Sequence, residues 1–238
     1  MTSVDTNERA PVAFRTPQGI EQIDAYLALI AERPELVEGR AALPIITDRD
    51  RLIAYAEDTG AAVGMVMTSP FMHTVVDLLD LGHRVHPYSR MIPAERGNDD
   101  AVVAFAVTGD RDDLSVLLIE QFRHATGRYH LEVPRGAAQP GMSLAQTAAA
   151  ELSEETGYRA NRVRLLGTTY TDTGILTQRM AIHLLTDLTY VGVVHEELEL
   201  IRSVRAVPLD EVIRLAARGE ITDGYLLQAL AMFRAGSY

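Results

Sequence analysis

Residues 136–158 decide how this chain is interpreted, and they read GAAQPGMSLAQTAAAELSEETGY. Ser143 is expected to cap an alanine-rich helix that continues to about Thr156. Gly157 is expected to end that helix, because glycine adopts the left-handed conformation common at helix C-termini. The stretch therefore predicts a glycine-containing loop that leads directly into a helix.

Three glutamates on this predicted helix are candidates for metal binding. Glu154 and Glu155 follow Glu151 by three and four residues, which places all three carboxylates on one face of a helix. Like charges at this spacing repel each other unless a cation lies among them, and carboxylate oxygens are preferred ligands of Mg²⁺ and Mn²⁺. The alternative is a solvated acidic face on a surface helix.

The spacing of the whole stretch resembles the Nudix box. That box has Gly, five residues, Glu, seven residues, and then Arg-Glu-apolar-x-Glu-Glu-x-Gly-apolar. Here Gly136, Glu151 and Tyr158 occupy matching positions, whereas Met142 replaces the first Glu and Ala150 replaces the Arg. In the family, that Arg orients a catalytic carboxylate and the first Glu supports the geometry of loop and helix. The resemblance thus implies an intact metal-binding core with reduced turnover.

The flanking segments resemble the ADP-ribose pyrophosphatase branch of the same family. Residues 118–123 read LIEQFR and residues 131–136 read LEVPRG, similar to a strand that ends in arginine and a following Glu-apolar-Pro-x-Gly segment. The resemblance implies that Arg123 contacts the substrate diphosphate and that Glu132 lies close to the metal or the ribose. Arg135 stands where that branch has alanine, and it is either a second phosphate ligand or a surface residue.

Glu120 and Arg123 also have a simpler interpretation, because a glutamate and an arginine at a strand end can form an ordinary ion pair. The resemblance covers residues 88–235, which is more than half of the chain. It leaves the N-terminal part without an assigned role.

The activity implied by the resemblance is hydrolysis of a nucleoside diphosphate linked to another moiety, in the first place ADP-ribose or a related nucleotide sugar. The expected cofactor is Mg²⁺ or Mn²⁺, with Glu151, Glu154 and Glu155 as its ligands and with Glu151 and Glu154 also acting in catalysis. Glu151 and Glu155 are the first candidates for direct ligands. The chain is thus expected to be a Nudix-type diphosphatase.

The general base is expected on an acidic segment after the box. Residues 195–199 read HEELE, and Glu197 is the first choice, followed closely by Glu196 and Glu199. The alternative interpretation of this segment is a solvated acidic turn.

The rest of the chain alternates helical and strand patterns. Residues 20–30 repeat apolar side chains at helical spacing, and Asp48 is expected to cap a helix over 49–58. Pro87, Pro93 and the polar residues after them mark a boundary, placed between about 88 and 98. We expect strands at residues 62–67, 74–79, 101–108, 114–121, 130–133, 163–170, 180–188 and 203–207, and closing helices at 209–218 and 222–234.

Strands that mix a hairpin with intervening helices favour an α/β (α+β) fold. The resemblance makes this a Nudix-type α/β/α sandwich with a mixed sheet over residues 91–238. Residues 1–90 form a smaller N-terminal α/β region. Strands between residues 62 and 88 are a possible dimerisation element, because N-terminal strands serve a homodimer in the ADP-ribose pyrophosphatase branch.

Composition limits the partners of the chain. Its net charge of −11 disfavours binding of a nucleic-acid backbone, and it has no cysteine for disulfides or thiolate metal sites. All 22 basic residues are arginines, so a phosphate would be recognised by guanidinium groups. We find no apolar run of membrane length and no signal-peptide pattern, and we expect a cytoplasmic protein without nucleic-acid or membrane partners.

Three other functions stay open from the sequence. Met142 and Ala150 permit a degenerate Nudix domain that binds a nucleotide without efficient hydrolysis. A specialised biosynthetic pyrophosphatase that acts on an unusual nucleotide fits the same residues. An acidic α/β protein with a chance match to the box is the third.

Overall fold

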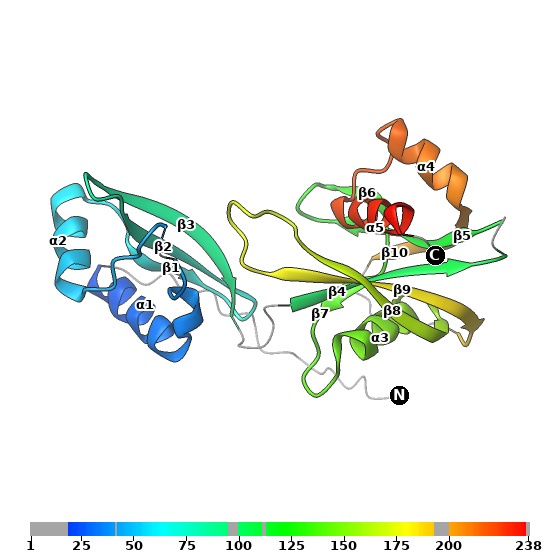
Figure 1. Ribbon diagram of the computed structural model, residues 1–238, viewed down its shortest axis with the longest axis horizontal. Coiled ribbons are helices and arrows are strands. Elements are labelled where there is room, and N and C mark those ends of the chain that lie inside the picture. Colours follow the sequence, from blue (N-terminus) through cyan, green and yellow to red (C-terminus); the bar gives the residue numbers. More distant parts are fainter. Residues whose placement is uncertain (1–18, 41, 95–99, 111–112, 193–199, 237–238) are drawn as a thin grey trace, which may run out of the picture. The chain divides into compact units, whose positions relative to one another are not determined.

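A computed structural model describes residues 19–40, 42–94, 100–110, 113–192 and 200–236. The chain divides into two compact units (Figure 1). The first consists of Met1–Arg96 with Gly174–Thr177, and the second of Gly97–Thr173 with Gln178–Tyr238.

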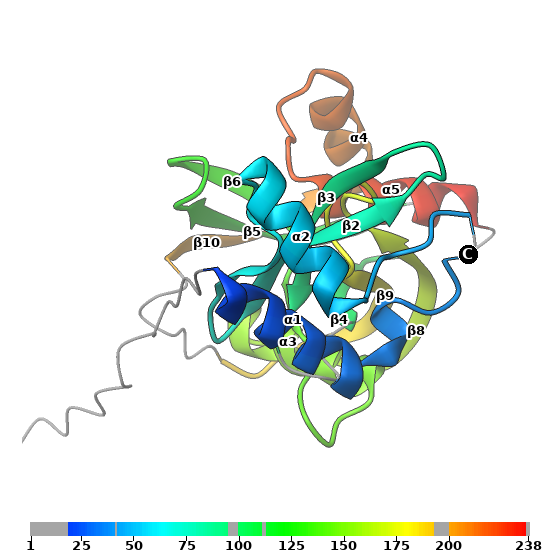
Figure 2. The ribbon, with the colours of Figure 1, turned by 90° about the vertical axis from the view of Figure 1, so that its left-hand side faces the viewer.

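The first unit packs two helices on a small antiparallel sheet. Its elements are α1 (Ile20–Glu32), the short 3-10 helix η1 (Pro34–Leu36), α2 (Arg49–Thr59), β1 (Gly64–Thr68), β2 (Met72–Asp80) and β3 (Val85–Pro93). The strands are ordered β1-β2-β3, and both helices lie over this sheet (Figure 2). Tyr26 of α1, Leu52 of α2 and Leu78 of β2 are fully buried in one core.

The third strand of this unit was missed from the sequence. Pro87 and Pro93 were interpreted as a boundary, but both lie within β3. β3 is an edge strand, where a residue without an N–H group removes no bond to a further strand. Proline there is compatible with strand structure, so its presence does not mark a break.

A buried ion pair connects the elements of the first unit. Arg90 on β3 donates to both carboxylate oxygens of Asp77 on β2, at 2.5 and 3.0 Å, and the Tyr26 hydroxyl donates to Asp77 at 2.7 Å. Burial, together with the negative charge of Asp77, raises the pKa of Tyr26 well above its ordinary value. Removing one partner would leave an uncompensated buried charge, so the three residues stabilise the unit together.

The second unit is built on a seven-stranded mixed sheet. Its elements are β4 (Asp100–Thr108), β5 (Ser115–Arg123), β6 (Arg128–Glu132), β7 (Arg135–Ala137), α3 (Leu144–Thr156), β8 (Tyr158–Tyr170), β9 (Arg179–Tyr190), β10 (Ile201–Pro208), α4 (Leu209–Ala217) and α5 (Gly224–Ala235). The strand order is β10-β5-β4-β9-β8, with β6 paired to β5 and β7 to β4. β4 and β9 are parallel, and the other pairs are antiparallel.

Helices cover both faces of this sheet, as the sequence predicted (Figure 1). β4 is buried on both sides because its residues alternate between two cores. Val102 and Ala104 pack with Leu152 of α3, whereas Val103 and Phe105 pack on the side of α4 and α5. The fold is an α+β sandwich with a mixed sheet.

The helix of the box begins and ends where its sequence predicted. The Ser143 hydroxyl accepts from the Gln146 N–H, and the Gln146 side chain accepts from the Ser143 N–H, which completes a capping box. Gly157 ends α3 with φ of 75°, a left-handed conformation that favours glycine. β7 and the start of β8, before residue 163, were not predicted. Each is continuous with a loop or a helix end.

In the parts of the chain that the structure describes, no helix has both the length and the apolar character needed to cross a bilayer.

Candidate active site

Gly136 of the loop and Glu151 of the helix of the box lie close together. Gly136 lies on β7, which pairs with β4, and Glu151 lies in the middle of α3. A Cβ atom added to Gly136 would lie 2.5 Å from Oε2 of Glu151 and closer still to Oε1 and Cδ. Glycine is therefore required at this position so that the Glu151 carboxylate can lie against the backbone of β7.

Gln139 supplies a side-chain donor to the same carboxylate. Its Nε2 atom is 3.4 Å from Oε1 of Glu151, a long hydrogen bond. The Gln139 N–H also points to the Thr147 hydroxyl at 3.4 Å, which connects the loop to the first turn of α3. Met142, which stands where the box has its first Glu, is 48% exposed. Gln139 thus connects the loop both to the Glu151 carboxylate and to the first turn of α3.

The three glutamates of α3 have different surroundings. Glu155 is buried, Glu151 is half-buried and Glu154 is exposed. Among the residues that the structure describes, no three His, Cys, Asp or Glu side chains converge closely enough to enclose a metal ion. The donor chemistry nevertheless fits a hard divalent cation, because such ions prefer carboxylate oxygens and α3 carries three glutamates.

A buried carboxylate between two arginines lies next to this helix. Glu132, which ends β6 and is 1% exposed, accepts from Nε and Nη2 of Arg123, with 2.6 Å as the shortest distance. Nη2 of Arg135 donates to the same carboxylate at 3.2 Å. In the β5–β6 hairpin, Arg123 at the end of β5 lies opposite Arg128, and Glu132 at the end of β6 lies opposite Ile119 in the middle of β5.

The residues predicted to bind substrate are thus brought together, although they bind each other here. Arg123 pairs with Glu132, whereas Glu120 pairs with Arg202 of β10 at 2.5 Å. The ion pair considered for Glu120 and Arg123 is therefore replaced by two separate pairs. The side chains of Arg123 and Arg135 are 29% and 24% exposed, so part of each remains accessible to solvent.

Asp223 and Tyr225 at the start of α5 complete the cluster. The Asp223 side chain accepts from the Leu226 N–H at 2.8 Å and caps the helix. The Arg135 guanidinium stacks over the Tyr225 ring at 4.6 Å from its centroid, and the Tyr225 hydroxyl accepts from Thr171 at 2.9 Å. These residues were not predicted as site residues, although Asp223 before an apolar helical pattern is a recognisable N-cap signal.

Arg123 of the cluster interacts electrostatically with Glu155 of α3. Burial acts to lower the pKa of Arg123, but hydrogen bonding to Glu132 and the charges of Glu132, Glu155 and Asp223 outweigh it and raise the pKa. Burial raises the pKa of Asp223, and the nearby Glu132 carboxylate raises it further. The site therefore combines fixed guanidinium charge with one carboxyl group, that of Asp223, whose pKa is raised.

The predicted general base, Glu197, and its close alternatives Glu196 and Glu199 lie outside the described residues.

Comparison with known proteins places this site in a recognised context. A family model described as the NUDIX domain matches residues 97–230. An ADP-ribose pyrophosphatase of Bacillus subtilis (strain 168) is 30% identical over 142 residues, which is 57% of this chain and 74% of the relative. An ADP-ribose pyrophosphatase of Mycobacterium tuberculosis (strain ATCC 25618 / H37Rv) is 29% identical over 136 residues, covering 56% of this chain and 65% of the relative.

A third relative acts on a different nucleotide. The CMP-5'-(N-acetyl-N-hydroxy-3-aminopropyl)phosphonate hydrolase of Streptomyces rubellomurinus (strain ATCC 31215) is 32% identical over 122 residues, covering 51% of this chain and 59% of the relative. This chain spans less than two thirds of the second and third relatives. Among solved structures, that of an ADP compounds hydrolase aligns with a TM-score of 0.63 at 24% identity, covering 73% of this chain and 90% of that one.

Proposed function

Because the chain belongs to the NUDIX domain family, we propose that it hydrolyses a nucleoside diphosphate linked to another moiety, in the first place ADP-ribose or a related nucleotide sugar. The observation that carries this proposal is the Glu151 carboxylate held against Gly136, where a side chain would displace it. Such an oriented carboxylate beside a loop backbone is what a phosphoanhydride hydrolase needs to position its reacting groups.

The proposed ligands of a divalent cation, Mg²⁺ or Mn²⁺, are Glu151 and Glu155, with Glu154 as a further ligand. When bound, such a cation neutralises phosphoryl oxygens and lowers the pKa of a bound water. Gln139 donates a long hydrogen bond to one oxygen of Glu151, which helps to orient the carboxylate. The exposed Glu154 fits a role at the solvent side of the site.

Arg123 and Arg135 are the proposed diphosphate ligands. Glu132 fixes both guanidinium groups by hydrogen bonds, so little side-chain freedom is lost when a phosphate binds their exposed faces. The Nε atom of Arg135 is buried and has no hydrogen-bond partner among the described residues, which leaves a donor for a bound group. Glu197 stays the proposed general base.

The CMP-phosphonate relative favours a second candidate, a specialised pyrophosphatase for an unusual cytidine nucleotide. Met142 and Ala150 support a third, a nucleotide-binding domain with slow turnover. A homodimer formed through strands between residues 62 and 88 and a cytoplasmic location stay predictions. Sedimentation at micromolar concentration tests the dimer.

The activity is tested with ADP-ribose, other nucleotide sugars and CMP-linked phosphonates in the presence of Mg²⁺ or Mn²⁺. A phosphatase that acts only on monoesters converts the products to inorganic phosphate, which is measured. We expect release by the wild-type chain, loss of release with EDTA, and loss in Glu151→Gln. Glu120→Gln serves as the matched control, because Glu120 is on β5 and paired to Arg202.

The nucleotide-binding domain would be supported if the wild type binds one of the substrates but releases no more phosphate from any of them than Glu151→Gln does. Preference for the cytidine compound would support the second candidate instead.

A further inference from the structure

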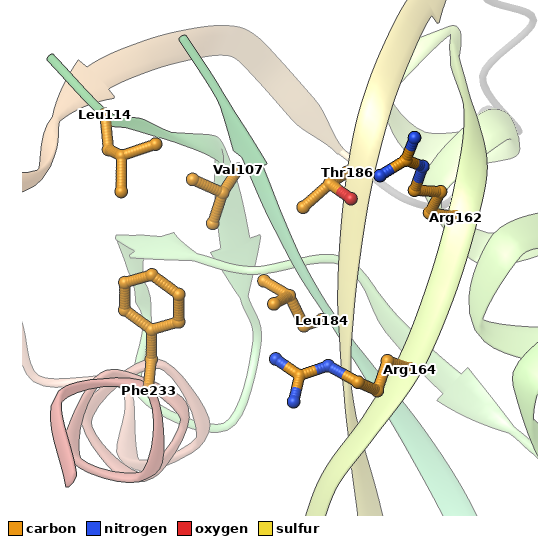
Figure 3. A pocket seen from close by; sticks show the side chains of 7 residues that line it. All are labelled: Val107, Leu114, Arg162, Arg164, Leu184, Thr186 and Phe233. Carbon is orange, nitrogen blue, oxygen red and sulfur yellow. The ribbon is translucent and has the colours of Figure 1, made fainter. Parts of the chain in front are cut away.

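The second unit contains a cavity of about 680 Å³ away from the loop and helix of the box. Its floor is apolar, and two arginines stand at its edge (Figure 3). The lining residues are Val107, Leu114, Arg162, Arg164, Leu184, Thr186 and Phe233. All of them belong to the second unit.

The strand register explains why both arginines line this cavity. On the paired strands β8 and β9, Arg162 lies opposite Thr186 and Arg164 lies opposite Leu184. Residues two apart on a strand point to the same face, so both guanidinium groups extend from one side of β8. Figure 3 shows Arg164 extending between Leu184 and Phe233, and Arg162 extending beside Thr186.

Phe233 closes the cavity from the helix above the sheet. It lies near the C-terminal end of α5, and its ring is 5.3 Å from that of Phe105 at the ring centroids. The contact with Phe105 fixes the Phe233 ring, which then offers an aromatic surface to the cavity at little further entropic cost.

The chemistry of the lining selects a class of ligand. Cavities that bind small molecules are typically about 300–1,000 Å³, mainly apolar, and carry a few convergent polar groups. Here those polar groups are the Thr186 hydroxyl and two guanidinium groups, in a chain with a net charge of −11. Arginine pairs well with planar or tetrahedral oxyanions.

This cavity is separate from the proposed active site. Phe233 is eight residues beyond Tyr225 on α5, which corresponds to roughly 12 Å along the helix axis. Val107 is at the far end of β4 from residues 101–103, which pair with β7. The two sites thus lie toward opposite ends of the same helix and the same strand.

We propose that this cavity is a second binding site, which takes a small amphipathic anion: an apolar or aromatic body that carries one carboxylate, sulfonate or phosphate group. The body lies on the floor formed by Leu184, Val107 and Phe233, and the anionic group pairs with a guanidinium group at the edge that Arg162 and Arg164 form. The proposal does not depend on which substrate the unit hydrolyses.

The test uses anilinonaphthalene sulfonate, a fluorescent aromatic anion of this class, titrated into the full chain. We expect saturable binding in the wild type. The double variant Arg162→Gln/Arg164→Gln should bind on the order of tenfold more weakly, because each removed charge is at an exposed position. Arg159→Gln is the matched control, since Arg159 is an exposed arginine of β8 that does not line the cavity, and it should bind within twofold of the wild type.

Competition identifies the body of the ligand. Decanoate and AMP are added separately to the dye complex, with inorganic phosphate as the head-group control. Displacement by decanoate indicates an alkyl body and displacement by AMP an aromatic one, and either supports the site. The proposal is overturned if the double variant binds the dye as tightly as the wild type, or if Arg159→Gln loses as much affinity as the double variant. It is also overturned if neither organic anion displaces the dye, or if inorganic phosphate displaces it equally well. Circular dichroism of each variant verifies that the fold is retained.

Discussion

Substitution of Gly136 by alanine tests whether the position of the Glu151 carboxylate matters. The added Cβ would lie 2.5 Å from Oε2 of Glu151, whereas ordinary van der Waals contact begins at 3.4 Å. The carboxylate must therefore move by about 1 Å, and further where its other atoms lie closer. Misplacement of a reacting group by about 1 Å can cost on the order of 100-fold in rate, about 2.7 kcal/mol.

Stability should change little in the same variant. The obstructing atoms are the far end of a flexible, half-buried side chain, which can rotate away without moving the backbone. Alanine also lowers the entropy of the unfolded chain, which offsets part of the cost. We expect the free energy of unfolding to change by less than about 1 kcal/mol, and Tm by no more than about 4 °C.

The assay measures kcat/KM on the substrate that the wild type hydrolyses fastest, together with thermal unfolding of each variant. Gly224→Ala is the matched control, because an added Cβ there meets no atom within 4 Å. It should keep wild-type activity. If Gly136→Ala keeps kcat/KM within about threefold of the wild type, the carboxylate does not act from this position and the reasoning fails. Loss of activity that accompanies unfolding would count against it as well.

Three further predictions follow from buried and oriented charges. Glu132→Gln should lower the free energy of unfolding in urea by about 2–3 kcal/mol, because two partly buried guanidinium groups lose their carboxylate; Glu120→Gln should cost less than about 1 kcal/mol, and equal losses would contradict the argument. The pKa of Asp223 is raised in the folded state, so protonation of this carboxyl group stabilises the fold. The free energy of unfolding of the wild type, relative to that of Asp223→Asn, should therefore fall as pH rises from below 3.8 through the raised pKa. Urea unfolding over a pH series in which that difference stays constant or rises would disprove the prediction. Gln139→Leu should lower kcat by about three- to tenfold through loss of the long hydrogen bond to Glu151, with little change in Tm; unchanged kcat would show that Gln139 does not orient the carboxylate.

Much of the second unit could be predicted because its signals are local. Ser143 and Gly157 mark the ends of α3 by capping chemistry that depends on neighbouring residues alone. The apolar run at residues 101–108 predicted a strand, and the structure shows β4 there, buried on both faces. β3 was missed because proline is tolerated at an edge, and whether a strand is at an edge depends on its neighbours in the sheet.

For the candidate site, the sequence by itself identified the residues that we propose to carry the chemistry. The spacing of Glu151 and Glu155 along one helix and the presence of Arg123 and Glu132 before the box are properties of the chain, and they led to the family that the comparison supports.

Only the tertiary structure decided how these groups pair. Arg123 and Glu132 are nine residues apart and meet because β5 and β6 form a hairpin, and Arg135 joins them from the next strand. Gln139 and Asp223 joined the site through folding as well. The physical reason is that capping and periodicity act over a few residues, whereas pairing between charges depends on distances through space that only the packed sheet and helices set.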